Sequence, residues 1–158
     1  MIIVADSSPI LSLSIIGKLD LLNKIFDNFI IPQAVYSELI VPNKPHSDIL
    51  RSCLKNNVKT IANKVAVDIL NIEIGLGESE AIILAIENNI NTILVDDYKA
   101  RIVAEYKQLD VIGTIGLLLK AKRCGFIDRV KPLLDKLIEN NIRISNELYM
   151  TALLKASE

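Results

Sequence analysis

Acidic side chains recur where short apolar runs of this sequence end. Asp6 directly follows the β-prone run at residues 2–5, and Asp96 and Asp97 follow a second such run at residues 92–95. Runs of this kind are typical of buried parallel strands, whose carboxyl ends meet at one edge of a sheet, where α/β proteins bind ligands. Three glutamates expected on helices complete the set of candidate acids: Glu38, Glu78 and Glu80.

The chemistry available to such a cluster follows from its residue types. Carboxylates that converge on one crevice repel one another unless a positive charge lies between them. Asp and Glu without His or Cys favour the hard cations Mg²⁺ and Mn²⁺ over zinc. His46 is the only histidine, and Cys53 and Cys124 are isolated, with no CxxC pair. The sequence therefore argues against a histidine-based triad or a zinc site, and it predicts chemistry that depends on carboxylates.

Each acid also has a simpler structural explanation. Asp6 and Asp97 are placed where a helix cap is expected, and Glu78 and Glu80 stand in a first helical turn, where negative charge complements the helix dipole. Glu38 has the position of an exposed helix residue. Both interpretations stay open for each residue alone, whereas the joint placement of the acids favours a metal site.

Local geometry separates the members of each acidic pair. Glu78 and Glu80 are two residues apart and cannot face the same way on a helix, so one direct ligand is expected from this pair. Glu80 is favoured because it lies on the side expected to pack on the sheet, with Glu78 in a supporting role, orienting a water or a neighbouring side chain. Consecutive residues leaving a strand point in opposite directions. Asp97 is favoured here, with Asp96 close behind.

The elements that position these acids follow from apolar periodicity and from cap and stop residues. Strands are predicted at residues 2–5, 29–31, 92–95 and 110–112, with an edge strand or extended linker at 58–61. Helices are predicted at residues 10–16, 19–25, 33–41, 47–54, 98–106, 114–122, 129–139 and 146–156. A loop at 75–80 leads into an apolar, buried helix, and 65–74 is ambiguous. This alternation predicts an α/β fold with a parallel sheet and helices on both faces.

Composition sets further bounds on the chain. Hydrophobic residues make up 51% and aromatic residues 4% of its 158 residues, typical of one domain, over residues 1–158, with an aliphatic core. The formal net charge of −1 argues against a protein that grips nucleic acid by bulk electrostatics, so any such role must be local. No apolar run reaches the length of a membrane span, and the amino terminus lacks a signal-peptide pattern. A cytoplasmic protein is expected.

Five segments of the sequence resemble the PIN-domain nucleases, in particular the small VapC-type toxins and their relatives. These segments are IVADSSPIL, VYSELIVP, GLGESEAIILAI, ILVDDYKAR and GTIGLLLKAK. The resemblance covers nearly the whole chain and depends on the order and spacing of the acids. It implies a three-layer α/β/α sandwich with a parallel central sheet, an acidic site that binds Mg²⁺ or Mn²⁺, and endoribonuclease activity.

The same resemblance assigns the catalytic positions to four acids: Asp6, Glu38, Glu80 and Asp97. Asp6, Glu80 and Asp97 are the expected metal ligands, and Asp96 is a further candidate. The sequence departs from the family pattern at two places: Glu80 stands where Asp is more frequent, and Val95 stands where Ser or Thr is frequent. Hydroxyl support is therefore expected from Ser7 or Thr114.

RNA is the implied substrate, and side chains that follow the acid-bearing loops are candidate contacts to it. The candidates for phosphates are Lys99, Arg101, Lys120, Lys122 and Arg123, and those for base stacking are Tyr36 and Tyr98. A solvated helix face is the alternative explanation for the cations. The resemblance to toxins also implies a small antitoxin partner and a homodimer.

Two other classes of function are weighed against a nuclease. A phosphoryl-accepting α/β regulatory domain would place an acid pair after its first strand, where this chain has only Asp6. A haloacid-dehalogenase-like phosphatase would need a second Asp two residues later, where this chain has Ser8. A PIN-like module that is catalytically silent and serves binding alone stays open as the alternative to an enzyme.

Overall fold

The centre of the molecule is a parallel sheet of five strands in the order β3-β2-β1-β4-β5, in a computed structural model that describes residues 1–158. The strands are β1 Ile2–Ala5, β2 Asn28–Pro32, β3 Val58–Lys59, β4 Thr92–Leu94 and β5 Asp110–Ile112. The chain builds β2 and β3 on one side of β1 and then crosses to build β4 and β5 on the other. The strand order therefore reverses beside β1, which is where α/β sheets form a ligand crevice.

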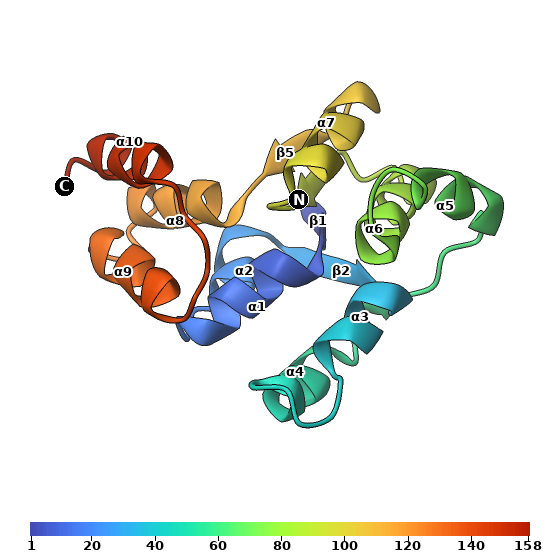
Figure 1. The fold of residues 1–158 in the computed structure, drawn as a ribbon, viewed down its shortest axis with the longest axis horizontal. Coiled ribbons are helices and arrows are strands. Elements are labelled where there is room, and N and C mark those ends of the chain that lie inside the picture. Colours follow the sequence, from blue (N-terminus) through green and yellow to red (C-terminus); the bar gives the residue numbers. More distant parts are fainter.

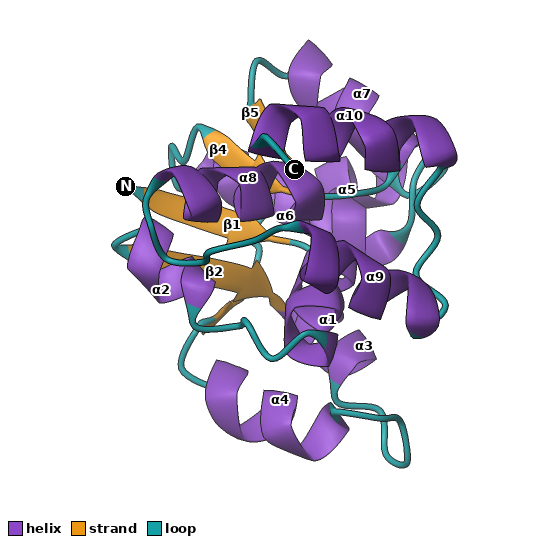
Figure 2. Cartoon of the chain, turned by 90° about the vertical axis from the view of Figure 1, so that its left-hand side faces the viewer, coloured by secondary structure: helices purple, strands orange, loops and turns teal.

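Helices cover both faces of this sheet, which confirms the three-layer α/β/α architecture (Figures 1 and 2). The helices are α1 Ser7–Ile15, α2 Leu21–Ile25, α3 Gln33–Leu39, α4 Ser47–Leu54, α5 Lys64–Leu70, α6 Leu76–Glu87, α7 Tyr98–Tyr106, α8 Thr114–Arg123, α9 Lys131–Glu139 and α10 Asn146–Ala156. None of them is both long and apolar enough to cross a membrane.

The alternation of side chains along β1 divides the core in two. Ile3 and Ala5 belong to the larger apolar cluster, together with residues of α1, α2, α8, α9 and α10. Val4 points to the opposite face, into a smaller cluster formed with α6 and α7. Because neighbouring residues of a strand face opposite sides of a sheet, β1 is buried on both faces, as its uninterrupted apolar run predicts.

Several elements begin and end where the sequence predicts, namely α4, α7, α10 and β5. Helix α1 differs, because it begins at Ser7 rather than at residue 10. Pro9 is tolerated there, since its missing N–H lies in the first turn, where backbone donors have no partner within the helix. The ambiguous segment 65–74 contains all of α5 except its first residue, Lys64, and the side chain of Asn63 accepts a hydrogen bond from the Ala66 N–H at 3.0 Å to cap the helix.

Helix α6 is buried along most of its length, as predicted from its apolar sequence. It begins at Leu76, so the predicted loop at 75–80 is wrong beyond Gly75. Glu78 and Glu80 both lie in helical turns as a result. Their side chains therefore leave the helix in different directions, one toward the crevice beside β1 and the other toward α3, as described below.

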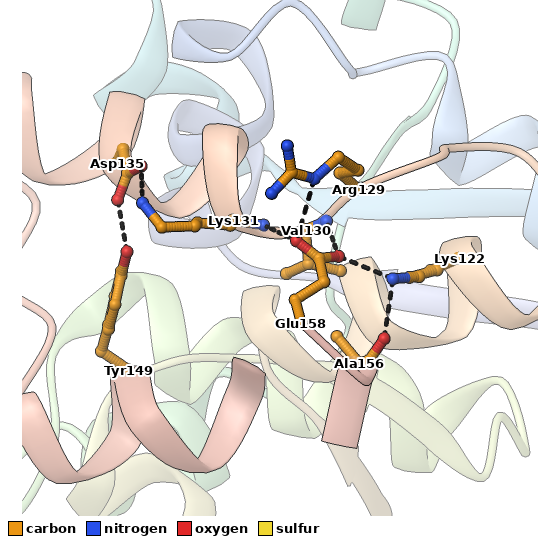
Figure 3. Close-up of polar contacts among 8 residues, drawn as sticks. All are labelled: Lys122, Arg129, Val130, Lys131, Asp135, Tyr149, Ala156 and Glu158. Atoms are coloured by element: carbon orange, nitrogen blue, oxygen red, sulfur yellow. Dashed lines mark hydrogen bonds and ion pairs between the residues drawn. The ribbon is translucent and has the colours of Figure 1, made fainter. Parts of the chain in front are cut away.

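The carboxylate of Glu158 joins the end of α10 to α8 and α9 (Figure 3). It accepts hydrogen bonds from the backbone N–H groups of Val130 at 2.6 Å and Lys131 at 2.9 Å, and from Lys122 Nζ at 2.7 Å. Burial by itself would raise the pKa of Glu158, but these hydrogen bonds outweigh it and lower the pKa to about 2. Lys122, a predicted RNA contact, is thus occupied in holding three helices together.

Candidate active site

Asp6 lies at the carboxyl end of the central strand and is almost completely buried, with 1% of its surface exposed. Its backbone occupies the N-cap position of α1, in an extended conformation with φ −88° and ψ 168°, yet its side chain makes no capping hydrogen bond. Both carboxylate oxygens are buried without any hydrogen-bond partner. A buried carboxylate without hydrogen bonds destabilises the folded state. The capping explanation of Asp6 therefore fails, and a role in binding a positive charge is favoured.

The surroundings of Asp6 raise its pKa from 3.8 to about 7. Burial is the main cause and the negative charge of Glu78 is second, with smaller contributions from Glu38 and Asp96; the Ser7 backbone N–H acts in the opposite direction. Three acids from three separate elements thus act on one buried carboxyl group. Such an arrangement is stable only with a proton on Asp6 or with a cation among the acids.

Glycine at position 77 makes room where two of these acids meet. A Cβ atom there would lie 3.4 Å from Glu38 Oε2 and 3.5 Å from Asp6 Oδ1. The carboxylates of Glu38 and Asp6 therefore face the same small space at the start of α6. Glu78, one residue further on, folds back over Gly75, where a Cβ atom would collide with its carboxylate. Both glycines of the GLG segment thus leave space for acidic side chains.

Asp96 is held in place by the first residue of α8. It accepts hydrogen bonds from the Thr114 backbone N–H at 2.7 Å and from Thr114 Oγ1 at 2.5 Å. Thr114 is 4% exposed, and it is one of the two residues, with Ser7, from which the sequence predicts hydroxyl support. A Cβ atom at Gly113 would lie 2.9 Å from Asp96 Oδ1 and 2.8 Å from Arg101 Nη1, so both side chains lie against this junction.

The two acids that the sequence favoured within their pairs have other partners. Glu80 Oε2 accepts a hydrogen bond from the Ala34 backbone N–H at 2.8 Å, at the N-terminus of α3. Asp97 is the N-cap of α7 and accepts from the Ala100 N–H at 2.8 Å. Glu80 and Asp97 are therefore engaged at helix ends, and the structure instead brings Glu78 and Asp96 to act on Asp6. For Asp97, the sequence already indicated the N-cap position as the alternative to a metal ligand.

The acids fit a divalent cation by their chemistry. They offer only oxygen atoms as ligands, which Mg²⁺ and Mn²⁺ prefer. The two carboxylate oxygens of Asp6 have no hydrogen-bond partner, and a divalent cation would take the place of one. With the side chains as they lie, no three Asp, Glu, His or Cys residues are grouped closely enough to hold an ion together. Binding would therefore need rotation of long side chains such as Glu38 and Glu78 about their χ angles.

The surface around the acids is hollowed on two sides. A groove of about 660 Å³ includes Asp96, Thr114 and two predicted RNA contacts, Arg101 and Lys120, in its lining. A smaller hollow of about 260 Å³ is lined by Ser7 and Glu38 on the other side. Both include Ser8 and Leu11, near the start of α1. Asp96 therefore belongs to the lining of the larger groove and Glu38 to that of the smaller hollow, and the start of α1 belongs to both.

The remaining predicted RNA contacts lie in several places. Lys99 and Tyr98 are exposed outside both hollows, and Tyr98 exposes 75% of its surface. Tyr36 is partly buried, and its hydroxyl donates a hydrogen bond to the Arg51 carbonyl oxygen at 3.3 Å. Arg123 lines the larger groove.

Comparison with known proteins gives one match. A model of a family described as a PIN domain matches residues 2–158. No curated protein and no solved structure matches the chain.

Proposed function

This chain belongs to the PIN domain family, and on that premise we propose that it is a metal-dependent endoribonuclease that hydrolyses RNA phosphodiester bonds. The observation that carries the proposal is the buried carboxylate of Asp6, which has no hydrogen-bond partner and faces three further acids. An unsatisfied buried acid of this kind is a feature of functional sites, since a structural residue at the same place would have a partner.

The acids proposed to hold the ion are Asp6, Glu38, Glu78 and Asp96. Their oxygen-only donor set supports Mg²⁺ or Mn²⁺. When bound there, a divalent cation supplies the positive charge that polarises a phosphodiester and lowers the pKa of water. We assign positioning roles to Glu80, which ties α6 to α3, and to Asp97, which caps α7.

The chain's own residues prepare this site for a polyanionic substrate. Thr114 fixes the direction of the Asp96 carboxylate through two hydrogen bonds. Glu38 and Glu78 approach Asp6 around the first turn of α6, where either carboxylate is placed to orient an attacking water molecule. Arg101, beside Asp96, offers a positive charge to a phosphate oxygen. No nucleophilic side chain is needed for hydrolysis by water.

The biological setting that we propose rests on the resemblance of the sequence to VapC-type toxins. In this setting the chain is a single nuclease domain, the toxin of a toxin–antitoxin pair in the cytoplasm. A small antitoxin protein would block the acidic site, and the nuclease would act as a homodimer.

The test is cleavage of a panel of single-stranded and structured RNAs by purified protein with Mg²⁺, Mn²⁺ or EDTA. Asp6→Asn serves as the matched variant, since it keeps the shape of the side chain and removes its charge. Cleavage by the wild type that requires metal and is at least about a hundredfold slower in Asp6→Asn would support the proposal. If both proteins are folded and equally inactive, and neither binds Mn²⁺ in calorimetry, the chain is a binding module instead.

A further inference from the structure

The larger groove is lined by residues of α8 and α10 and by the segment 141–144 that precedes α10. Its lining includes Asp96 and Thr114 as well as Arg143 and Lys155. Helices α8, α9 and α10 lie together on one side of the molecule, at the left in Figure 1. The groove is therefore built from segments far apart in the sequence, and one of the proposed metal-holding acids, Asp96, belongs to its lining.

The charge of this groove is the reverse of the charge of the whole chain. Its lining contains five cationic residues, namely Arg101, Lys120, Arg123, Arg143 and Lys155, and a single acid, Asp96. None of the five forms an ion pair within the protein. In a chain with a formal net charge of −1, this concentration of unpaired positive charge beside the acids attracts a polyanion.

The apolar part of the lining indicates which portion of the ligand is held. It is entirely aliphatic, with residues such as Ile115, Leu119 and Leu148, and it includes no Phe, Tyr or Trp. Base stacking on aromatic rings is the usual means of holding single-stranded nucleic acid by its bases. A groove with cations and aliphatic side chains, but no rings, suits a sugar–phosphate backbone better than it suits unstacked bases.

The second hollow shares one wall with the groove. It shares Ser8 and Leu11 with the groove and continues to Lys44 and His46. The two hollows therefore share the start of α1, the helix that begins directly after Asp6. With the scissile phosphate of a bound strand beside Asp96, the cations of the groove would hold one flank of that strand.

We propose that this groove binds the backbone of single-stranded RNA on one side of the scissile phosphate, without reading its bases. The inference rests on the proposed ribonuclease function, since it states how that site holds its substrate. Arg123 and Arg143 are exposed, belong to the lining and are not among the proposed metal-holding residues, so we assign their charges to binding alone.

The experiment measures binding separately from cleavage. A labelled, unstructured RNA is titrated with full-length Asp6→Asn protein in EDTA, and fluorescence anisotropy is followed over a range of KCl concentrations. The double substitution Arg123→Ala, Arg143→Ala is added to this background. The matched control is Lys55→Ala, Lys136→Ala, which removes the same charge from exposed positions outside both hollows.

The expected result is a roughly tenfold weaker affinity for the groove variant, with a salt dependence whose slope falls by about 0.7 for each lost phosphate contact. The control is expected to bind like its parent, and RNAs of different sequence are expected to lose affinity equally. Equal weakening in both variants, or no RNA binding at all, would overturn the inference. A third result would also overturn the inference: the Arg123 and Arg143 substitutions weaken binding of poly-glutamate but leave RNA binding unchanged. The groove would then fit an acidic protein segment.

The outcome is independent of the cleavage test. If the groove variant binds RNA weakly while the wild type never cleaves RNA, the binding groove stands and the proposed enzyme activity fails. If wild-type protein cleaves RNA but the groove variant binds it normally, the activity stands and the groove has no part in it.

Discussion

The carboxyl group of Asp6 combines burial, missing hydrogen bonds and three acidic neighbours in one side chain. Burial and the negative charges of these neighbours disfavour its charged form, and together they raise its pKa to about 7. Because the unfolded chain loses this proton near pH 3.8, the folded state binds more protons than the unfolded state between the two values. Without metal, the stability of the protein should therefore decrease as pH rises through this window.

The first prediction concerns Asp6→Asn in metal-free buffer. This variant is expected to be more stable than the wild type at about pH 8, by about 2 kcal/mol, because it removes a buried charge, and the difference should shrink toward pH 5. Urea denaturation in EDTA at both pH values measures it. A variant less stable than the wild type at both pH values would show that the Asp6 carboxylate has a stabilising partner in the protein.

The second prediction compares the members of one acidic pair. Glu78→Gln should raise the metal-free melting temperature by easing repulsion with Asp6, and it should weaken the stabilisation that Mn²⁺ gives to the wild type. Glu80→Gln should instead lower the free energy of unfolding by about 0.5–1 kcal/mol, because it removes a negative charge from the N-terminus of α3. The stabilisation by Mn²⁺ should stay the same in this variant.

Thermal denaturation with and without Mn²⁺ measures both effects in the same samples. If Glu80→Gln abolishes the Mn²⁺ response and Glu78→Gln preserves it, the original choice of Glu80 as ligand is right, and the hydrogen bond to Ala34 must be exchanged for the metal.

At the scale of elements, the acidic site depends on how helices begin. Helices α1, α6 and α8 all start beside the carboxyl edge of the sheet, and their first turns carry or hold Asp6, Glu78 and Asp96. Far from this edge, the Glu158 carboxylate fixes the start of α9 to the end of α10. This contact keeps one wall of the proposed RNA-binding groove in place, because α8, α9 and α10 all contribute to its lining.

The third prediction follows from the low pKa of Glu158. Its folded pKa of about 2 lies below the ordinary value of 4.5, so its stabilising contribution is complete above about pH 4.5 and is lost as the pH falls toward 2. Glu158→Gln should therefore cost about 2 kcal/mol at neutral pH and much less at about pH 3. Chemical denaturation across this range measures the difference, and a cost that does not depend on pH would show that the charge is unimportant.

At the scale of the whole molecule, the sheet has a strong centre and a weak edge. β1 is paired on both sides and buried on both faces, whereas β3 consists of two residues at the edge. Local opening needs less free energy where fewer buried contacts and backbone hydrogen bonds must break.

The fourth prediction is that the backbone amides of β1 exchange at least about a hundredfold more slowly than those of β3 and α5. Hydrogen exchange followed by mass spectrometry, with peptides that cover residues 2–5 and 58–70, measures this difference. Equal protection of both segments would mean that the edge strand and α5 belong to the same cooperative unit as the central strand.

The sequence by itself determined the sheet, most of the elements and the edge at which the acids lie. Apolar runs and helix signals placed α4, α7, α10 and β5 at their observed boundaries, because these signals act over a few neighbouring residues. The same local signals put Asp6 and the Asp96–Asp97 pair at the carboxyl ends of parallel strands. The family resemblance drawn from these segments agrees with the match over residues 2–158.

Only the tertiary structure decided which acid of each pair acts on Asp6 and which cations line one groove. Glu80 is engaged by the Ala34 N–H, which is 46 positions away in sequence, and Asp96 by Thr114, which is 18 positions away. Arg101 of α7 and Lys155 of α10 line the same groove although they are far apart in the sequence. The direction of a polar side chain depends on the nearest unsatisfied partner in space, and packing of distant segments determines which partner that is.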